Sequence, residues 1–136
     1  MKRKELILYL QKIFQQHHLS KNHSLICAQY LVKSELIGAK SHGLSRLKMY
    51  CDRIKKGVIN PKPKIKVKKL TSSIFHINAD NSIGFVAADI GIQCAIKSAQ
   101  KNGMGLVAIK KSGHYGLSSF YAEQAVKKKF NSILFY

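Results

Sequence analysis

The stretch Asn60-Pro61-Lys62-Pro63 divides the sequence into two parts with different periodicity. Proline removes a backbone donor and restricts the residue before it, so this stretch ends a helical segment. Apolar residues recur at helical spacing before it, whereas after it they alternate with polar residues as in a strand. We therefore predict an α/β protein, with a helical region over residues 1–60 and a partial α/β domain over residues 61–136.

Three helices are predicted before this stretch. Apolar residues spaced for one helical face occupy residues 6–16. Ser20 is a typical N-cap for a second helix, which ends near Gly38. A third helix follows residues 41–43 and ends near Gly57, because a glycine after a basic turn is a typical C-terminal signal.

Strands and helices alternate in the second part. The predicted elements are a hairpin of strands 65–70 and 73–79, a helix over 83–102, a strand over 105–110, a helix over 117–129 and a strand over 132–136. The order of strand, helix and strand predicts right-handed crossover connections and at least two parallel strands. We expect a mixed sheet with crossover helices.

The chain is strongly basic, with 24 Lys and Arg against six Asp and Glu and a formal net charge of +18. Only Arg3, Arg46 and Arg53 are arginines, and the densest cluster, residues 62–69, alternates Lys with Ile and Val. Proteins that read nucleic acid favour arginine and interleaved aromatic residues. We therefore expect no specific nucleic-acid partner, with weak polyanion binding as a side effect of the charge.

Cysteine usage and hydropathy exclude several other classes of protein. Cys27, Cys51 and Cys94 are odd in number and include no Cys-x-x-Cys pair, which argues against a disulfide scaffold or a zinc site. No apolar run is long enough for a signal peptide or a membrane span. We expect a cytoplasmic protein with no membrane partner and no metal.

A first candidate site lies in the stretch Ser41-His42-Gly43-Leu44-Ser45-Arg46-Leu47-Lys48-Met49-Tyr50. His42, Arg46 and Tyr50 are four residues apart, so on a helix they share one face. An imidazole, a guanidinium and a phenol together suit a small anionic ligand, since Arg grips a carboxylate through two hydrogen bonds and His exchanges protons near neutral pH. The same spacing also fits a solvated basic face with a packed tyrosine.

A second candidate site follows the apolar run 106–109, where Gly113 and Gly116 bracket His114. A strand that ends in a tight glycine turn is a common way to present a reactive side chain at the edge of a sheet. The sequence contains no Gly-x-Gly-x-x-Gly after a strand and no Gly-Lys-Ser/Thr loop. A Rossmann dinucleotide site is therefore not predicted.

Several landmarks occur in a fixed order along the chain: Ser41-His42-Gly43, Arg46 with Tyr50, Arg53-Ile54-Lys55-Lys56-Gly57-Val58-Ile59-Asn60-Pro61, Asp80-Asn81-Ser82-Ile83-Gly84, Gly103-Met104-Gly105-Leu106-Val107 and Ser112-Gly113-His114-Tyr115-Gly116. In this order they resemble the N-terminal part of the malate/L-lactate dehydrogenase family, which also contains ureidoglycolate and sulfolactate dehydrogenases. The resemblance implies a non-Rossmann, sulfolactate-dehydrogenase-like fold, incomplete in this chain. Family members are considerably longer, and the chain stops in the apolar run 131–136, so we expect a truncated or partial form.

The resemblance also implies a chemistry, namely reversible hydride transfer between NAD or NADP and a small 2-oxo acid or 2-hydroxy acid. It assigns His114 as general acid/base and Arg46 as the group that holds the substrate carboxylate. His42 and Tyr50 would line the pocket, with Ser41 as a weaker candidate. His42 is also an alternative proton donor, and the sequence does not choose between the two histidines.

Other functions stay open from the sequence. The complete enzyme is expected to be a homo-oligomer such as a dimer. The chain is alternatively an inactive remnant of an enzyme, a basic polyanion-binding module, or a subunit-interaction fragment whose unfinished sheet edge pairs with another copy.

Overall fold

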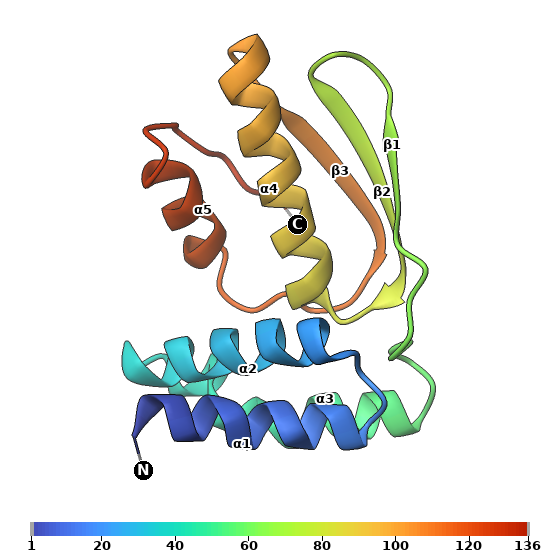
Figure 1. Ribbon diagram of the computed structural model, residues 1–136, viewed down its shortest axis with the longest axis vertical. Helices are drawn as coiled ribbons and strands as arrows, with labels where there is room; N and C mark the ends of the chain where they lie inside the picture. The colour runs from blue at the N-terminus through green and yellow to red at the C-terminus, as the bar shows by residue number, and fades with distance from the viewer. Residues whose placement is uncertain (1, 136) are drawn as a thin grey trace.

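The computed structural model describes residues 2–135. Its elements are α1 (Arg3–Gln16), α2 (Lys21–Leu36), the 3-10 turns η1 (Lys40–His42) and η2 (Leu44–Arg46), α3 (Leu47–Lys55), β1 (Lys66–Lys69), β2 (Ile74–Ser82), α4 (Gly84–Asn102), β3 (Leu106–Ser112) and α5 (Ser119–Val126). Helices α1, α2 and α3 lie together at one end of the molecule, α4 lies beside the sheet, and α5 lies next to α4 (Figure 1). None of the helices in this part of the chain is long and apolar enough to cross a bilayer.

The helix ends follow the sequence signals. The Ser20 hydroxyl accepts a hydrogen bond from the backbone N–H of His23 at 3.2 Å, which confirms the predicted N-cap of α2. Helix α4 ends at Gly103, whose φ of +81° is the left-handed conformation that favours glycine. Gly57, with φ +71°, likewise follows α3.

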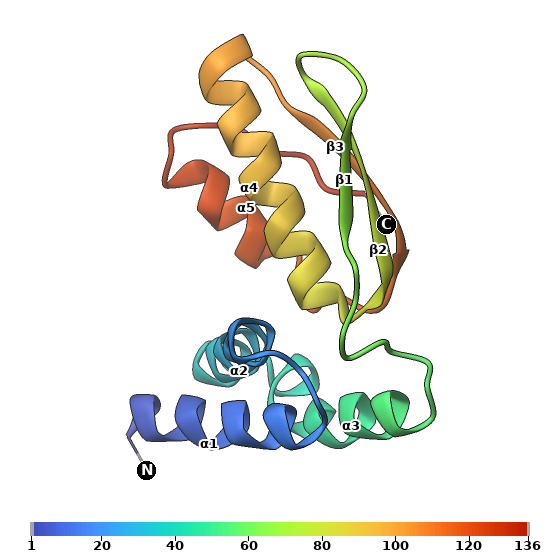
Figure 2. The same ribbon diagram turned by 45° about the vertical axis from the view of Figure 1, so that its right-hand side comes forward.

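The three strands form one mixed sheet in the order β1-β2-β3. Strands β1 and β2 are antiparallel, which confirms the predicted hairpin, and β2 and β3 are parallel, as their connection through α4 requires. Helix α4 lies against one face of this sheet (Figure 2). A Cβ on Gly91 would lie 2.8 Å from Cδ1 of Ile109, so the helix approaches β3 closely.

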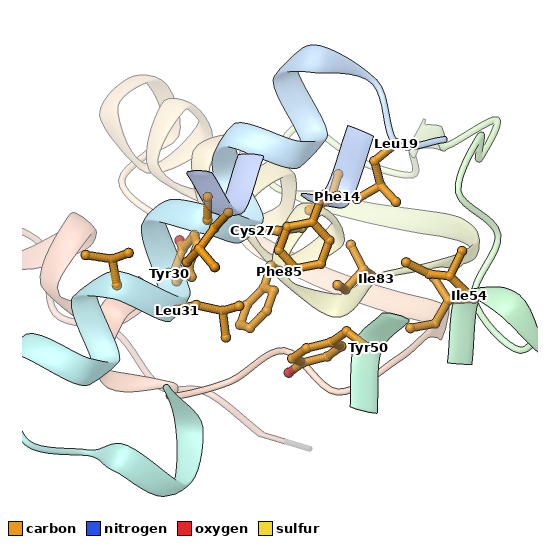
Figure 3. Packing of buried hydrophobic residues seen from close by; sticks show 14 of the residues in the cluster. Phe14, Leu19, Cys27, Tyr30, Leu31, Tyr50, Ile54, Ile83 and Phe85 are labelled. Carbon is orange, nitrogen blue, oxygen red and sulfur yellow. The ribbon is translucent and has the colours of Figure 1, made fainter. Parts of the chain in front are cut away.

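Buried aromatic and aliphatic residues join the helical part to the α/β part (Figure 3). The ring of Phe85 at the start of α4 stacks on Tyr30 of α2 at a centroid distance of 5.5 Å. It also packs against Tyr50 of α3 at 5.1 Å. Because one aromatic ring contacts both helices, the position of α3 is fixed relative to the loops at this end of the sheet.

The predicted strand over residues 132–136 is wrong for its described part, because residues 132–135 form neither strand nor helix. Ile133 and Phe135 are 81% and 86% exposed. Residues with high β propensity form a strand only when they can pack on a sheet and pair with a neighbouring strand. Among the described residues the sheet contains only β1, β2 and β3, so residues 132–135 have no strand to pair with. Tyr136 lies outside the described residues.

Candidate active site

The segment that carries His42 and Arg46 is not one helix with Tyr50. It forms two 3-10 turns that meet at Gly43, and α3 begins only after Arg46. Gly43 has φ −94° and ψ −138°, outside the helical region, and a Cβ there would lie 2.4 Å from the carboxylate of Glu35. The prediction that His42 shares a helix face with Tyr50 is therefore wrong, because the chain turns between them.

The fold nevertheless brings His42, Tyr50 and His114 together. The Tyr50 hydroxyl lies 2.8 Å from Nδ1 of His114, and the ring of His42 stacks on the His114 ring at a centroid distance of 5.7 Å. These residues come from η1, α3 and the loop between β3 and α5, and Tyr50 and His114 are 64 residues apart in the chain. Tertiary packing, and not helical spacing, assembles the cluster.

Close backbone packing at the start of α4 fixes the loop that carries His114. A Cβ on Gly84 would lie 2.3 Å from the carbonyl oxygen of Gly113 and 2.4 Å from that of His114. Gly116 has φ +79°, and a Cβ there would lie 2.6 Å from the ring of Phe85. Gly116 is therefore required by its left-handed φ and by its close approach to Phe85, and Gly84 is required by its close approach to the loop that carries His114.

The hydrogen bonds at Nδ1 determine which ring nitrogen of His114 meets a ligand. The backbone N–H of Gly116 donates to Nδ1 at 3.3 Å, and the Tyr50 hydroxyl is within hydrogen-bond distance of the same atom. These contacts engage Nδ1 within the protein, and the donor and acceptor roles of the ring nitrogens depend on the tautomer of the ring. Nε2 is the nitrogen available to exchange a proton with a bound molecule.

Arg46 is held against the turn that contains Ser41. Its Nε donates to the Ser41 carbonyl oxygen at 2.6 Å, and its Nη1 lies 3.7 Å from the sulfur of Met49. The Ser41 hydroxyl in turn lies 3.0 Å from Nδ1 of His42. Among the described residues, Nη2 of Arg46 has no hydrogen-bond partner, so this end of the guanidinium is available to an anion.

Burial and positive charge both act on the titratable groups of the cluster. Partial burial lowers the pKa of His114, and the positive charges of His42, Arg46 and Arg53 lower it further. Burial raises the pKa of Tyr50, which is 1% exposed, while Arg46 and Arg53 oppose that rise. His114 is therefore poised as a neutral base near neutral pH, next to cations that suit a negatively charged ligand.

Arg53 was not among the predicted site residues, although it lay within the motif that carried the family resemblance. It is seven residues after Arg46 and three after Tyr50, so on α3 it shares a face with Tyr50. The spacing of three residues from Tyr50 was the signal in the sequence that could have placed Arg53 near the candidate site.

The carboxylates of Asp80 and Asp89 do not contact His114. Each is hydrogen-bonded to other residues of the fold. Asp89 accepts a hydrogen bond from Tyr30 at 3.0 Å. Asp80 accepts from Asn60 at 3.0 Å and from the backbone N–H of Lys64 at 2.9 Å. Within the part of the chain that the structure describes, no group of three or more His, Cys, Asp or Glu could hold a metal ion.

Comparison with known proteins identifies the family to which the chain belongs. A family model for malate/L-lactate dehydrogenase matches residues 1–136. The chain belongs to the malate/L-lactate dehydrogenase family. It is 36% identical to a ureidoglycolate dehydrogenase (NAD(+)) of Escherichia coli strain K12 over 87% of this chain and 34% of that protein. It is 35% identical to a malate/(S)-sulfolactate dehydrogenase of Methanothermus fervidus over 85% of this chain and 34% of that protein.

Solved structures of the family share the fold described above. The malate dehydrogenase of Pyrococcus horikoshii matches with a TM-score of 0.90 and 32% identity over 94% of this chain and 37% of that one. The sulfolactate dehydrogenase of Methanocaldococcus jannaschii matches with a TM-score of 0.90 and 30% identity over the same shares. The predicted fold class is confirmed, and the chain spans about a third of the length of these family members.

Proposed function

We propose that this chain is an oxidoreductase of the malate/L-lactate dehydrogenase type, in a partial form, that interconverts a small 2-oxo acid and the corresponding 2-hydroxy acid. The observation that carries the proposal is the contact of Tyr50 with His114, on which His42 stacks. Relatives named as malate, sulfolactate and ureidoglycolate dehydrogenases support it. Such a reaction needs one group that exchanges a proton at the substrate oxygen and another that holds the carboxylate.

His114 is the proposed proton-exchanging residue. Nε2 takes the hydroxyl proton of a 2-hydroxy acid in the oxidative direction and returns it to the carbonyl oxygen in the reductive direction. The lowered pKa of His114, caused by burial and then by the neighbouring cations, favours the neutral base. Tyr50 lines the pocket, and its hydroxyl orients the ring through Nδ1.

Arg46, His42 and Ser41 are the proposed substrate-binding residues around His114. Nη2 of Arg46 faces no partner among the described residues and is suited to the substrate carboxylate. The Ser41 hydroxyl fixes the His42 ring, which can hydrogen-bond the substrate or serve as the alternative proton donor. Substrate orientation by these groups converts the reaction into an effectively unimolecular step.

The hydride would come from NAD or NADP, which supplies or accepts it at the substrate carbon when bound. Gly103 and Gly105 do not form a phosphate cradle for that cofactor. Gly103 serves as the left-handed cap of α4, and a Cβ on Gly105 would lie 2.2 Å from the Ala95 carbonyl oxygen. The roles proposed for residues of this chain are therefore limited to proton exchange and to binding of the substrate carboxylate.

We further propose that the complete enzyme is a cytoplasmic homo-oligomer such as a dimer.

Binding of a 2-oxo acid at His114 tests the proposal directly. In nuclear magnetic resonance (NMR) titrations of the chain with pyruvate, we expect the ring resonances of His114 and His42 to shift saturably. Arg46→Ala should weaken pyruvate binding at least about tenfold, because a charge-assisted contact is lost. His17→Ala, at the end of α1, is the matched histidine control and should leave the affinity unchanged. If the chain is folded and its His114 resonances do not shift when pyruvate is added, the proposed function is overturned.

A second candidate function rests on the lysines of the β1–β2 hairpin. Lys66, Lys68 and Lys69 are exposed on β1, and the chain carries a net charge of +18. A polyanion-binding module would bind heparin with an affinity that falls steeply with salt and is indifferent to Arg46→Ala. Dependence of the main binding activity on Arg46 favours the oxidoreductase instead.

A further inference from the structure

The starting observation is a cavity lined by residues of α1, α2, α4 and α5, four helices that can be followed in Figure 1. Its volume of about 500 Å³ lies within the range of about 300–1,000 Å³ that is typical of small-molecule sites. The candidate active-site residues Ser41, His42, Arg46, Tyr50 and His114 are not part of its lining. The cavity is therefore separate from the candidate active site.

One wall of the cavity is a polar network around Asp89. The Tyr30 hydroxyl donates to Oδ1 of Asp89 at 3.0 Å, and Nε2 of Gln124 donates to the Tyr30 hydroxyl at 2.8 Å. Oε1 of Gln124 in turn accepts from Nε2 of Gln93 at 2.6 Å. Burial raises the pKa of Tyr30, so the phenol keeps the proton that it donates. The network holds the Asp89 carboxylate in a fixed orientation.

The Asp89 carboxylate has one oxygen available to a ligand. The hydrogen bonds that reach it from Tyr30 and Gln124 both end at Oδ1, and no described residue donates to Oδ2. Asp89 also takes part in none of the ion pairs of the described residues. It is half-buried, so solvent screens its charge only in part. Asp89 therefore places an uncompensated negative charge in the wall of the cavity.

Positive charges without a partner line the same cavity. Lys33 and Lys127 are both engaged by Glu123, the other acidic residue of the lining. Arg3 and Lys4, at the start of α1, take part in none of the ion pairs of the described residues, and both are exposed. The cavity thus contains uncompensated charges of both signs.

Apolar groups complete the lining. Ile7 of α1 is half-buried, and Phe120 of α5 is buried, with Nζ of Lys33 at 4.3 Å from the centre of its ring. Small-molecule sites combine such apolar walls with a few polar groups that fix the orientation of the ligand. The lining is therefore suited to a ligand that has an apolar body and charged groups of both signs.

We infer that this cavity binds an α-amino acid with a large apolar side chain in its zwitterionic form. The ammonium group donates to Oδ2 of Asp89, and Arg3 holds the carboxylate, since a guanidinium can bond both of its oxygens. The apolar side chain packs on Ile7 and Phe120. A ligand with a charge of only one sign would leave either Asp89 or Arg3 uncompensated. The inference is independent of the proposed function, because no residue proposed for that reaction takes part in it.

The test compares three ligands that share a phenyl ring and differ in their charged groups. We would titrate the chain with L-phenylalanine, phenethylamine and hydrocinnamate in about 150 mM NaCl, where binding to distant surface lysines is strongly screened. The side-chain amide resonances of Gln124, followed by NMR, report on the cavity. L-Phenylalanine should bind at least about fivefold more tightly than either analogue, the size expected for one partly solvated charge pair. L-Leucine is titrated as a second zwitterion.

Variants of the two charged residues test their separate roles. Asp89→Asn keeps an oxygen for the Tyr30 hydroxyl and should weaken L-phenylalanine binding about fivefold without weakening hydrocinnamate binding. Arg3→Gln, at an exposed position, should weaken L-phenylalanine binding by a similar factor without weakening phenethylamine binding. Asp52→Asn and Lys12→Gln are the matched controls, since they remove the same charges outside the lining, and should leave all affinities unchanged. Circular dichroism checks that each variant is folded.

Three results would contradict the inference. Equal affinities for L-phenylalanine and hydrocinnamate, with no effect of Asp89→Asn, would show that the cavity selects only an anion. Loss of L-phenylalanine binding in Arg46→Ala would place the ligand in the candidate active site instead. Absence of saturable binding of both L-phenylalanine and L-leucine by the folded chain would overturn the inference, whereas the pyruvate titration at His114 tests the proposed function separately.

Discussion

His114 is the residue whose proton affinity reports most directly on its surroundings. Burial and then the charges of His42, Arg46 and Arg53 lower its pKa below the usual 6.5. Arg46→Gln should therefore raise the pKa of His114 toward its ordinary value, because one repelling charge is removed. The measurement is an NMR titration of the His114 ring protons, with Arg3→Gln as the control for loss of an arginine elsewhere. An unchanged or lower pKa in Arg46→Gln would contradict the proximity of the two groups.

The backbone beneath His114 makes a second prediction at the scale of single residues. Gly84→Ala places a Cβ 2.3 Å from the Gly113 carbonyl oxygen, and this backbone atom is not the end of a flexible side chain. We expect the free energy of unfolding to fall by about 2 kcal/mol, the usual size of an overpacking penalty, and the His114 resonances to shift. Gly113→Ala is the matched control, because its Cβ would meet nothing closer than 3.6 Å. Equal stability of the two variants in urea denaturation would refute the close packing.

Single residues were the part of the site that the sequence indicated best. The glycines around His114 and the polar pattern of His42, Arg46 and Tyr50 identified the side chains that now lie close together. The contact between Tyr50 and His114 was not predictable from spacing, because it joins α3 to a loop 64 residues away. Only the packing of the helical part against α4 creates it.

At the scale of elements, periodicity and capping residues located the helices, the hairpin and the parallel pair. They failed where tertiary contacts override local pattern. The segment that precedes α3 turns at Gly43, which packs against Glu35, so helical spacing does not describe it. Residues 132–135 have the composition of a strand but no ladder in the described sheet.

The pairing of α1 with α2 makes a testable prediction at this scale. Phe14 of α1 is fully buried in the shared core, whereas Leu8 on the same helix is 56% exposed. Phe14→Ala should lower the free energy of unfolding by about 3–5 kcal/mol, because a large buried ring is replaced by a cavity. Leu8→Ala should change it by less than about 0.5 kcal/mol. Urea denaturation followed by circular dichroism measures both, and a comparable loss in Leu8→Ala would show that the core does not lie where the structure places it.

The whole molecule carries a net charge of +18 on a chain of 136 residues. Self-repulsion of this size destabilises the compact state, and salt screens it. We therefore expect the melting temperature to rise when NaCl is increased from about 50 mM to about 500 mM. Differential scanning calorimetry at the two salt concentrations measures the change. A melting temperature that stays constant or falls would mean that repulsion among the lysines contributes little to stability.

The proposal that matters most for the whole molecule is that this chain, which matches its family over residues 1–136, performs oxidoreductase chemistry of the family's kind. The most direct measurement is to incubate the folded chain with NADH or NADPH and a small 2-oxo acid and to follow both cofactor oxidation and formation of the 2-hydroxy acid. Our account predicts equal amounts of the two products and loss of the reaction in His114→Ala. A folded chain that binds the 2-oxo acid at His114 but forms no 2-hydroxy acid would contradict the assignment of oxidoreductase activity to it.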